Sequence, residues 1–211
     1  ASLLSSANGT FNNGITNQGR LDIASTALTM GGSLAGAGST SLLSGSAVIL
    51  NTSASSYSGA WDIKSGASAS MTAASNIGSG SMNLDGSLVL QTSASGDYTW
   101  NNVLTGAGML SVTLASDDDK FAFTGSTGTA YRGTLALTQG VIELAGSSDN
   151  NTRTLAKAAL LVGSDVEAVI TDGVNKLGNL TLEGGTLNVA SVGIAGGNGG
   201  LATDYISFMD S

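Results

Sequence analysis

The sequence predicts an all-β fold, a single right-handed parallel β-helix (solenoid) of roughly nine coils. Three observations support this prediction. Apolar and polar residues alternate over short runs, proline is absent from all 211 residues, and a long motif recurs after about 70 residues. Short strands separated by Gly, Ser, Asn and Asp clusters are typical of sandwiches, barrels and solenoids, and the repeat favours the solenoid.

The alternation places leucines on one face of each predicted strand. Leu84, Leu88 and Leu90 share a face in one run, and Leu135 and Leu137 share a face in a later one. The same spacing continues near residue 180. We therefore expect a common set of side chains to point into the core: Leu84, Leu88, Leu90, Leu135, Leu137, Leu182 and Leu187.

The repeat consists of two pairs of similar segments. Residues 34–38 read LAGAG and residues 104–108 read LTGAG, and a Tyr-x-Gly motif follows each, at Tyr57 and at Tyr131. The alternation then turns Tyr57, Trp61 and Tyr131 inward, which favours core packing over an exposed aromatic row that stacks on sugars. Residues 77–90 and 177–189 form a looser pair, in which an extra Gly near 184–185 predicts a bulge or slipped register.

The absence of proline and the 31 glycines fit stacked coils. Proline would remove a hydrogen bond from a ladder in which nearly every strand has two neighbours. Glycine supplies the positive φ that tight corners need. With coils of about 20 to 25 residues, the stack is expected to be about 40 Å long.

Residues 151–161 depart from the strand pattern. Helix-forming residues follow a Thr that could cap a short helix protruding from the solenoid. The strand-like composition of residues 162–170 comes directly after them. We expect strand or irregular coil over 155–162, with the short helix as the alternative.

The composition excludes several function classes. Without cysteine or histidine the chain has no disulfide, no Cys/His zinc site and no Ser-His-Asp triad. A net charge of −8 repels phosphate, so we expect no nucleic-acid partner. No segment reaches the roughly 18 apolar residues that cross a bilayer, and the first residues lack the features of a signal peptide. We therefore expect no direct membrane insertion of this chain.

Two charged groups are candidates for chemistry. Carbohydrate-active β-helices use acidic and basic residues on one outer face, and Asp62, Asp85 and Asp97 with Lys64, or residues 117–120, could serve in that way. The Asp run at 117–119 could instead bind Ca²⁺, with a solvated turn as the alternative. Residues 196–204 resemble a single copy of a calcium-binding nonapeptide, for which an inter-coil loop is the alternative. Because charge is sparse, we expect no enzyme, no metal and no cofactor.

These motifs resemble the repeats of bacterial autotransporter passenger domains. The resemblance lies in LTGAG at 104–108, YRGTLAL at 131–137, GVIEL at 140–144 and the paired Gly within 180–189, and it touches most of residues 34–190. It implies that residues 1–211 are a single β-helix fragment of a longer, adhesin-type and self-associating passenger. It also implies a signal peptide and an outer-membrane anchor beyond this chain.

The resemblance further implies a location and a role. Such passengers are displayed on the bacterial cell surface or secreted, and they mediate adhesion, aggregation or biofilm formation. The implied partners are other passengers or host surface and matrix molecules. A stalk that carries a binding tip elsewhere and a carbohydrate-active enzyme fragment are the alternatives. The sequence identifies no partner-binding residue.

Overall fold

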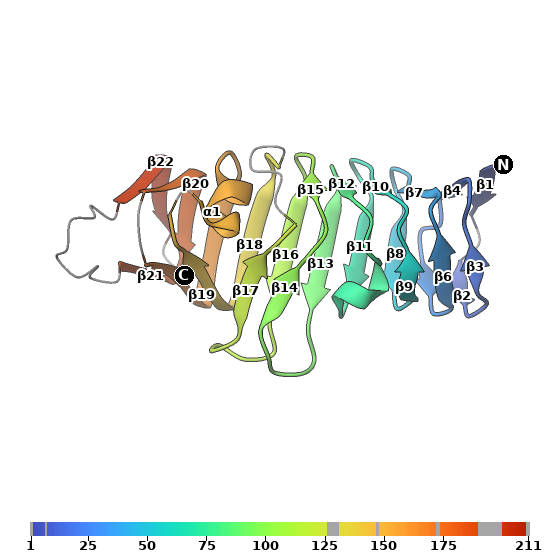
Figure 1. Ribbon diagram of the computed structural model, residues 1–211, viewed down its shortest axis with the longest axis horizontal. Helices are drawn as coiled ribbons and strands as arrows, with labels where there is room; N and C mark the ends of the chain where they lie inside the picture. Colours follow the sequence, from blue (N-terminus) through green and yellow to red (C-terminus); the bar gives the residue numbers. More distant parts are fainter. Residues whose placement is uncertain are drawn as a thin grey trace.

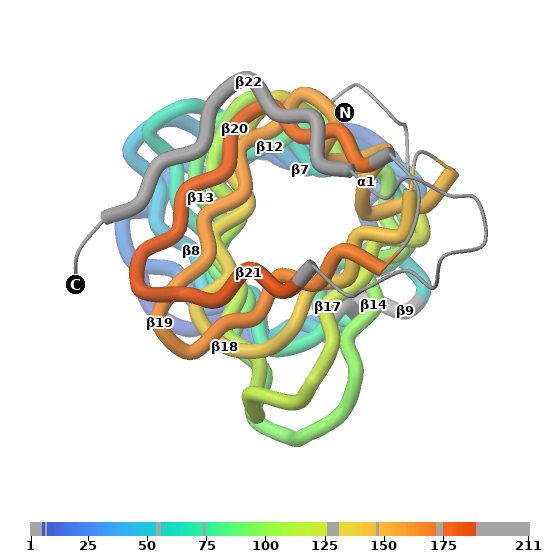
Figure 2. The backbone as a smooth tube through the Cα atoms, turned by 90° about the vertical axis from the view of Figure 1, so that its left-hand side faces the viewer, coloured from blue at the N-terminus to red at the C-terminus, as the bar shows by residue number. Residues whose placement is uncertain are grey.

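The computed structural model is nearly all β and describes residues 2–6, 8–125, 131–146, 148–171, 174–189 and 200–209. Parallel strands stack along one axis into an elongated solenoid (Figure 1). Viewed along that axis, the coils surround one shared interior (Figure 2). The predicted parallel β-helix is therefore confirmed.

Three sheets form the sides of the coils. Sheet A contains six strands in the order β1 (Ser2–Ser5), β4 (Arg20–Ile23), β7 (Ser39–Leu42), β10 (Trp61–Ile63), β12 (Met82–Leu84) and β15 (Leu104–Thr105). Sheet C contains β3 (Ile15–Thr16), β6 (Ser33–Gly36) and β9 (Ser53–Tyr57).

Sheet B continues along the whole described solenoid. Its main path runs through β2 (Gly9–Phe11), β5 (Leu28–Met30), β8 (Ala47–Leu50), β11 (Ser68–Met71), β13 (Ser87–Gln91), β16 (Met109–Thr113), β18 (Thr134–Leu144), β19 (Ala159–Ile170), β20 (Val174–Glu183) and β22 (Gly200–Met209). The strands β14 (Tyr98–Trp100), β17 (Lys120–Phe123) and β21 (Thr186–Val189) pair beside this path. Nine steps join the ten strands of the path, which matches the roughly nine coils expected.

Coil length varies while the ladder register is kept. Ala69 pairs with Leu88, 19 residues later, whereas Leu110 pairs with Leu135, 25 residues later. The additional residues lie at corners, and the loops before β14 and β17 extend beyond the outline of the other coils (Figure 2). A corner can therefore lengthen without disturbing the side chains that face inward.

The predicted core is confirmed with one partial exception. Six of the seven leucines are buried, and Leu187 is half-buried against the core. Tyr57, Trp61 and Tyr131 also point inward and are at most 1% exposed. Trp61 donates its indole N–H to the carbonyl oxygen of Ile77 at 2.8 Å, which satisfies its polar group inside the core.

Two predictions about turns need correction. Residues 84–90 are not one strand, because the chain turns a corner at Asp85 and Gly86 and enters another sheet. The glycines at 184–185 do not slip a register within a strand. Gly184, with φ of +75°, lies in the turn between β20 and β21.

The segment near residue 155 contains both expected conformations. Helix α1 spans Asn150–Leu155, a turn follows, and β19 begins at Ala159. The preference for strand or irregular coil over 155–162 is therefore correct after Leu155 and wrong at Leu155 itself. The cap is Asp149, whose carboxylate accepts from the backbone N–H of Thr152 at 3.0 Å. Leu155 is fully buried, so the helix packs its last turn into the core.

Buried asparagines join neighbouring coils at the corners. The side-chain amide of Asn102 donates to the carbonyl oxygens of Gly78 at 2.9 Å and Gly80 at 2.6 Å, one coil earlier. The carbonyl oxygen of the Asn151 side chain accepts from the backbone N–H of Phe123 at 2.7 Å. These bonds satisfy backbone groups that the strand ladders leave unpaired at the corners. The set comprises Asn17, Asn76, Asn102, Asn151 and Asn175.

Candidate functional site

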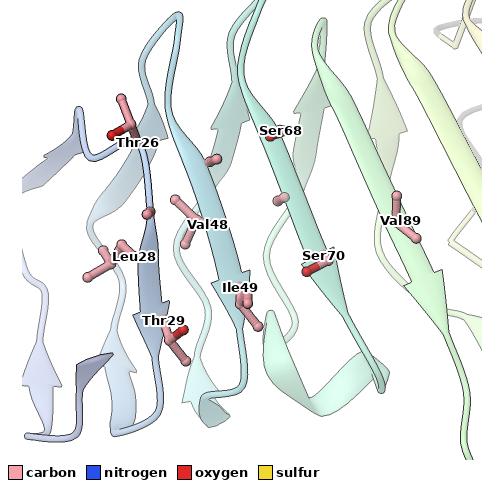
Figure 3. Close-up of a pocket in the computed structure, with 11 residues that line it drawn as sticks. Thr26, Leu28, Thr29, Val48, Ile49, Ser68, Ser70 and Val89 are labelled. Carbon is pink, nitrogen blue, oxygen red and sulfur yellow. The ribbon is translucent and has the colours of Figure 1, made fainter. Parts of the chain in front are cut away.

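An uncharged column runs down the outer face of sheet B. The ladder register aligns Thr29, Ile49, Ser70, Val89 and Ser111 on five successive strands. They alternate with inward residues, so their side chains point away from the core. Figure 3 shows four of these side chains on neighbouring strands of one sheet. A second column, two residues earlier on each strand, aligns Ala47, Ser68, Ser87 and Met109. We call these nine residues the neutral strip.

Apolar side chains lie open to solvent on this strip. Ile49 is 53% exposed, Met109 is 46% exposed and Val89 is 39% exposed. Among the described residues, the other large hydrophobic side chain of this kind is Phe11, which lies in the first strand of the sheet. Shallow hollows on the strip are lined by hydroxyl and methyl groups. An exposed apolar group thus occurs on three of these strands, and each points to solvent from the same face of the sheet.

Charge lies beside the strip and not on it. Lys64 and Asp85 lie at the corner between sheets A and B. Asp97, Asp117 and Asp118 lie in the loops at the opposite edge. The strip thus has the arrangement of a protein interface, with an uncharged centre and a charged rim.

A polar column occupies the outer face of sheet A. The register aligns Asp22, Ser41, Asp62, Asn83 and Thr105 on successive coils. A shallow groove runs along this face, and its lining includes Arg20, Ser39, Ser41, Ala60, Asp62, Lys64, Ser81, Asn83 and Thr105. We call it the polar groove.

Hydrogen bonds and ion pairs connect the side chains of the polar groove. Arg20 Nε lies 2.7 Å from Asp22 Oδ1, and this bond raises the pKa of Arg20. Lys64 Nζ pairs with Asp62 Oδ2 in the same way. The amide of Asn83 donates to Asp62 Oδ1 at 3.1 Å and to Asp85 Oδ2 at 2.9 Å. Asn83 therefore holds two carboxylates on one face.

The structure brings together only part of the first predicted chemical group. Asp62, Lys64 and Asp85 gather around Asn83, which the sequence analysis did not single out. Asp97 lies elsewhere, in the loop before β14, where its carboxylate accepts from the backbone N–H of Lys120 at 2.9 Å. The four residues proposed as one set therefore belong to two regions.

Residues 117–120 serve mainly to join two loops. Asp119 is 7% exposed, and its carboxylate accepts from the backbone N–H of Gly96 at 2.8 Å. Asp117 and Asp118 are exposed, so the alternative of a solvated turn describes two of the three acids. Within the described ranges, no three His, Cys, Asp or Glu side chains gather closely enough to hold a metal ion. The predicted nonapeptide at 196–204 lies outside the residues whose side chains are described.

The neutral strip was not predicted from the sequence, because it contains no charged residue and no motif that indicates chemistry. A signal for it was present. The segments 26–30, 47–51, 68–72 and 87–91 contain no charged residue, although acids occur before and after them. Their common register, which only the structure provides, turns four uncharged segments into one surface.

Fold and surface together define a parallel β-solenoid with one uncharged and one polar outer face. In the part of the chain that the structure describes, no helix is long and apolar enough to cross a membrane. No protein-family model matches the chain, and neither does any solved structure.

Two proteins of Escherichia coli K12 are similar to part of the chain. The uncharacterized lipoprotein YdeK is 34% identical over 100 residues, which cover 47% of this chain and 7% of YdeK. The uncharacterized protein YuaQ is 38% identical over 107 residues, which cover 49% of this chain and 7% of YuaQ. The similarity thus spans about half of the chain and a small part of each relative.

Proposed function

We propose that this chain is a surface-displayed autotransporter passenger segment that mediates bacterial adhesion, aggregation or biofilm formation through the neutral strip. The observation that carries the proposal is the exposure of Ile49, Val89 and Met109 on an uncharged face of a chain with net charge −8. Acidic surfaces repel one another, so the uncharged face is where another passenger or a host matrix molecule approaches at least electrostatic cost.

The dimensions of the strip favour many weak contacts. Five strands spaced by about 4.8 Å, each at most about five residues long, make a surface of roughly 400 Å². A standard protein interface buries about 800 Å² on each partner. A single contact is therefore expected to be weak, whereas many displayed copies bind strongly together. Weak contacts add up only when many copies lie side by side, as they would on a cell envelope. The lipoprotein name of one relative also favours that location.

A triple substitution tests the role of the strip. Cells that display the chain carrying Ile49→Lys, Val89→Lys and Met109→Lys are expected to settle and attach about tenfold less, because three charges must be desolvated on contact. The matched control is Ser58→Lys, Ser79→Lys and Thr99→Lys, which adds the same charge at exposed positions outside the strip. Equal behaviour of the two variants at matched surface expression would overturn the proposal and leave the stalk, which the elongated stack of coils favours.

A further inference from the structure

We infer that the polar groove on sheet A is a second binding site, which takes a linear, uncharged polysaccharide along the solenoid axis. The groove lies on a different sheet from the neutral strip, so this site is independent of the proposed function. Three properties of the groove carry the inference: its shape, its charge and the chemistry of its side chains.

Small and larger polar side chains alternate along the groove, and the serines leave open space between the charged groups. Ser39 and Ser41 lie on β7, and Ser81 lies directly before β12, two coils further along. The Arg20–Asp22 pair stands at one end, and Asp62, Lys64 and Asn83 stand further along. Five aligned positions spaced by about 4.8 Å give a row of roughly 19 Å, which fits an extended ligand.

Charge excludes the other ligand classes. Both cations of the groove, Arg20 and Lys64, are already paired with carboxylates, and Asp85 adds a further negative charge. A phosphate or an acidic polymer would meet a net negative surface. An apolar ligand would contact Ala60, Val103 and the edge of the largely buried Trp61, and it would strip water from the serines and charged groups beside them.

Uncharged hydroxyl-rich polymers match the groups that remain. A carboxylate accepts up to about four hydrogen bonds. Asp62 makes two bonds to protein side chains, one to Lys64 and one to Asn83, which leaves capacity for sugar hydroxyls. The ion pairs and the Asn83 amide hold these acceptors in fixed positions, so little side-chain freedom is lost on binding. Two such sets, one at Arg20 and Asp22 and one around Asn83, suit a polymer of repeating units.

The test measures binding of three linear probes, maltohexaose, cellohexaose and chitohexaose, to the whole chain by calorimetry and by the amide NMR signals of Asn83. We expect saturable binding of at least one probe and none of polygalacturonate, its acidic counterpart. The double variant Asp62→Ala, Asn83→Ala should weaken that binding at least tenfold. Ser39→Leu, which narrows the groove and keeps its ion pairs and the Asn83 amide, should weaken it as well.

A matched control lies further along the solenoid. Asn188 donates to Glu167 at 2.8 Å across neighbouring coils, with the same separation of 21 residues as Asn83 and Asp62. Glu167→Ala, Asn188→Ala should therefore leave sugar binding unchanged. The triple lysine variant of the neutral strip should also retain it, which separates this site from the proposed adhesive role. Absence of binding for all three probes up to about 10 mM, or equal loss in both double variants, would overturn the inference.

Discussion

Residues 36–63 and residues 106–137 use the same motif at different corners of the coil. In the first copy Gly36 pairs with Tyr57, and in the second Gly106 pairs with Tyr131. The first copy leads from sheet C into sheet A, whereas the second leads from sheet A into sheet B. The interval of about 70 residues therefore corresponds to three coils and one additional side.

The local contacts of the two copies agree closely. The hydroxyl of Tyr57 donates to the carbonyl oxygen of Gly38 at 2.6 Å, and that of Tyr131 donates to Gly108 at 3.0 Å. In each copy the residue two positions after the tyrosine is a glycine under its ring. The motif therefore specifies the conformation of a corner between two sheets. It does not specify which of the corners of the coil is formed.

The largest loss of stability is expected on substitution of the buried residue that follows the corner in each copy. Leu135, the counterpart of Trp61, is fully buried. Leu135→Asp places a carboxylate among apolar side chains and should lower the free energy of unfolding by several kcal/mol. Chemical denaturation measures the loss, and hydrogen exchange should show that it begins in the neighbouring coils. Thr134→Asp, on the outer face, is the control, and equal stability of the two variants would place Leu135 outside the core.

The glycines under the tyrosine rings should be equally intolerant in both copies. A Cβ atom at Gly59 would lie 1.7 Å from the carbonyl oxygen of Gly38, and one at Gly133 would lie 1.9 Å from that of Gly108. Gly59→Ala and Gly133→Ala should each cost about 3 kcal/mol in thermal unfolding, because backbone of the adjacent coil must move.

Gly45 provides the control for these two substitutions. Its φ is +82°, and a Cβ atom there would meet nothing within 4 Å. Gly45→Ala should therefore show the cost of backbone strain alone, about 1 kcal/mol. If all three variants lose the same stability, the close approach of the adjacent backbone to Gly59 and Gly133 is not what requires glycine there.

High pH should destabilise both copies together. Burial raises the pKa of Tyr57 and of Tyr131 above the ordinary value of 10.0. The folded state therefore keeps the neutral phenols, and its stability is constant below about pH 10 and falls as pH rises further. The loss should approach about 1.4 kcal/mol per pH unit for each tyrosine. Melting curves between pH 8 and pH 12, about the range of tyrosine ionisation, measure it.

Removing the hydroxyl groups should have the smallest effect and should distinguish the copies. Tyr57 also bonds to the buried hydroxyl of Thr40 at 2.8 Å, whereas the second bond of Tyr131 goes to the backbone carbonyl of Thr134 at 2.8 Å. Tyr57→Phe should cost about 2 kcal/mol and Tyr131→Phe about 1 kcal/mol, because the first removes the hydroxyl partner of the buried Thr40, whereas after the second the carbonyl oxygen of Gly108 still accepts from the backbone N–H of Thr134. Urea titrations compare them, and a larger loss for Tyr131→Phe would reverse the interpretation.

The sequence predicted the fold well because inward positions are dictated by burial. Alternation around Leu88, Leu135 and Tyr131 could be read directly, and each of these residues is buried. The junction at Asp85 and Gly86 was missed because leucines continue on both sides of it with the same spacing. The alternation of apolar and polar residues shows which side chains face the core. It does not show a corner at which that alternation continues unchanged.

The candidate surfaces could be predicted only in part. Asp62 and Lys64 lie close together in sequence, and their charge, like that of Asp85, predicted a chemical role. The neutral strip required pairing between residues some 20 positions apart, such as Ile49 with Ser70, and no local pattern specifies that register. The buried asparagines were also missed, because an asparagine that joins two corners looks like any other loop asparagine in the sequence.

The unequal lengths of the coils determine how the molecule responds to tension. Ladder hydrogen bonds run along the solenoid axis, so a pull on the two ends loads them one coil at a time and detaches coils in sequence. A fully extended residue spans about 3.4 Å, so the coil from Ala69 to Leu88 releases about 65 Å of chain and the coil from Leu110 to Leu135 releases about 85 Å. A solenoid under load thus lengthens in discrete steps, each of which dissipates energy while the remaining coils keep their outer faces intact.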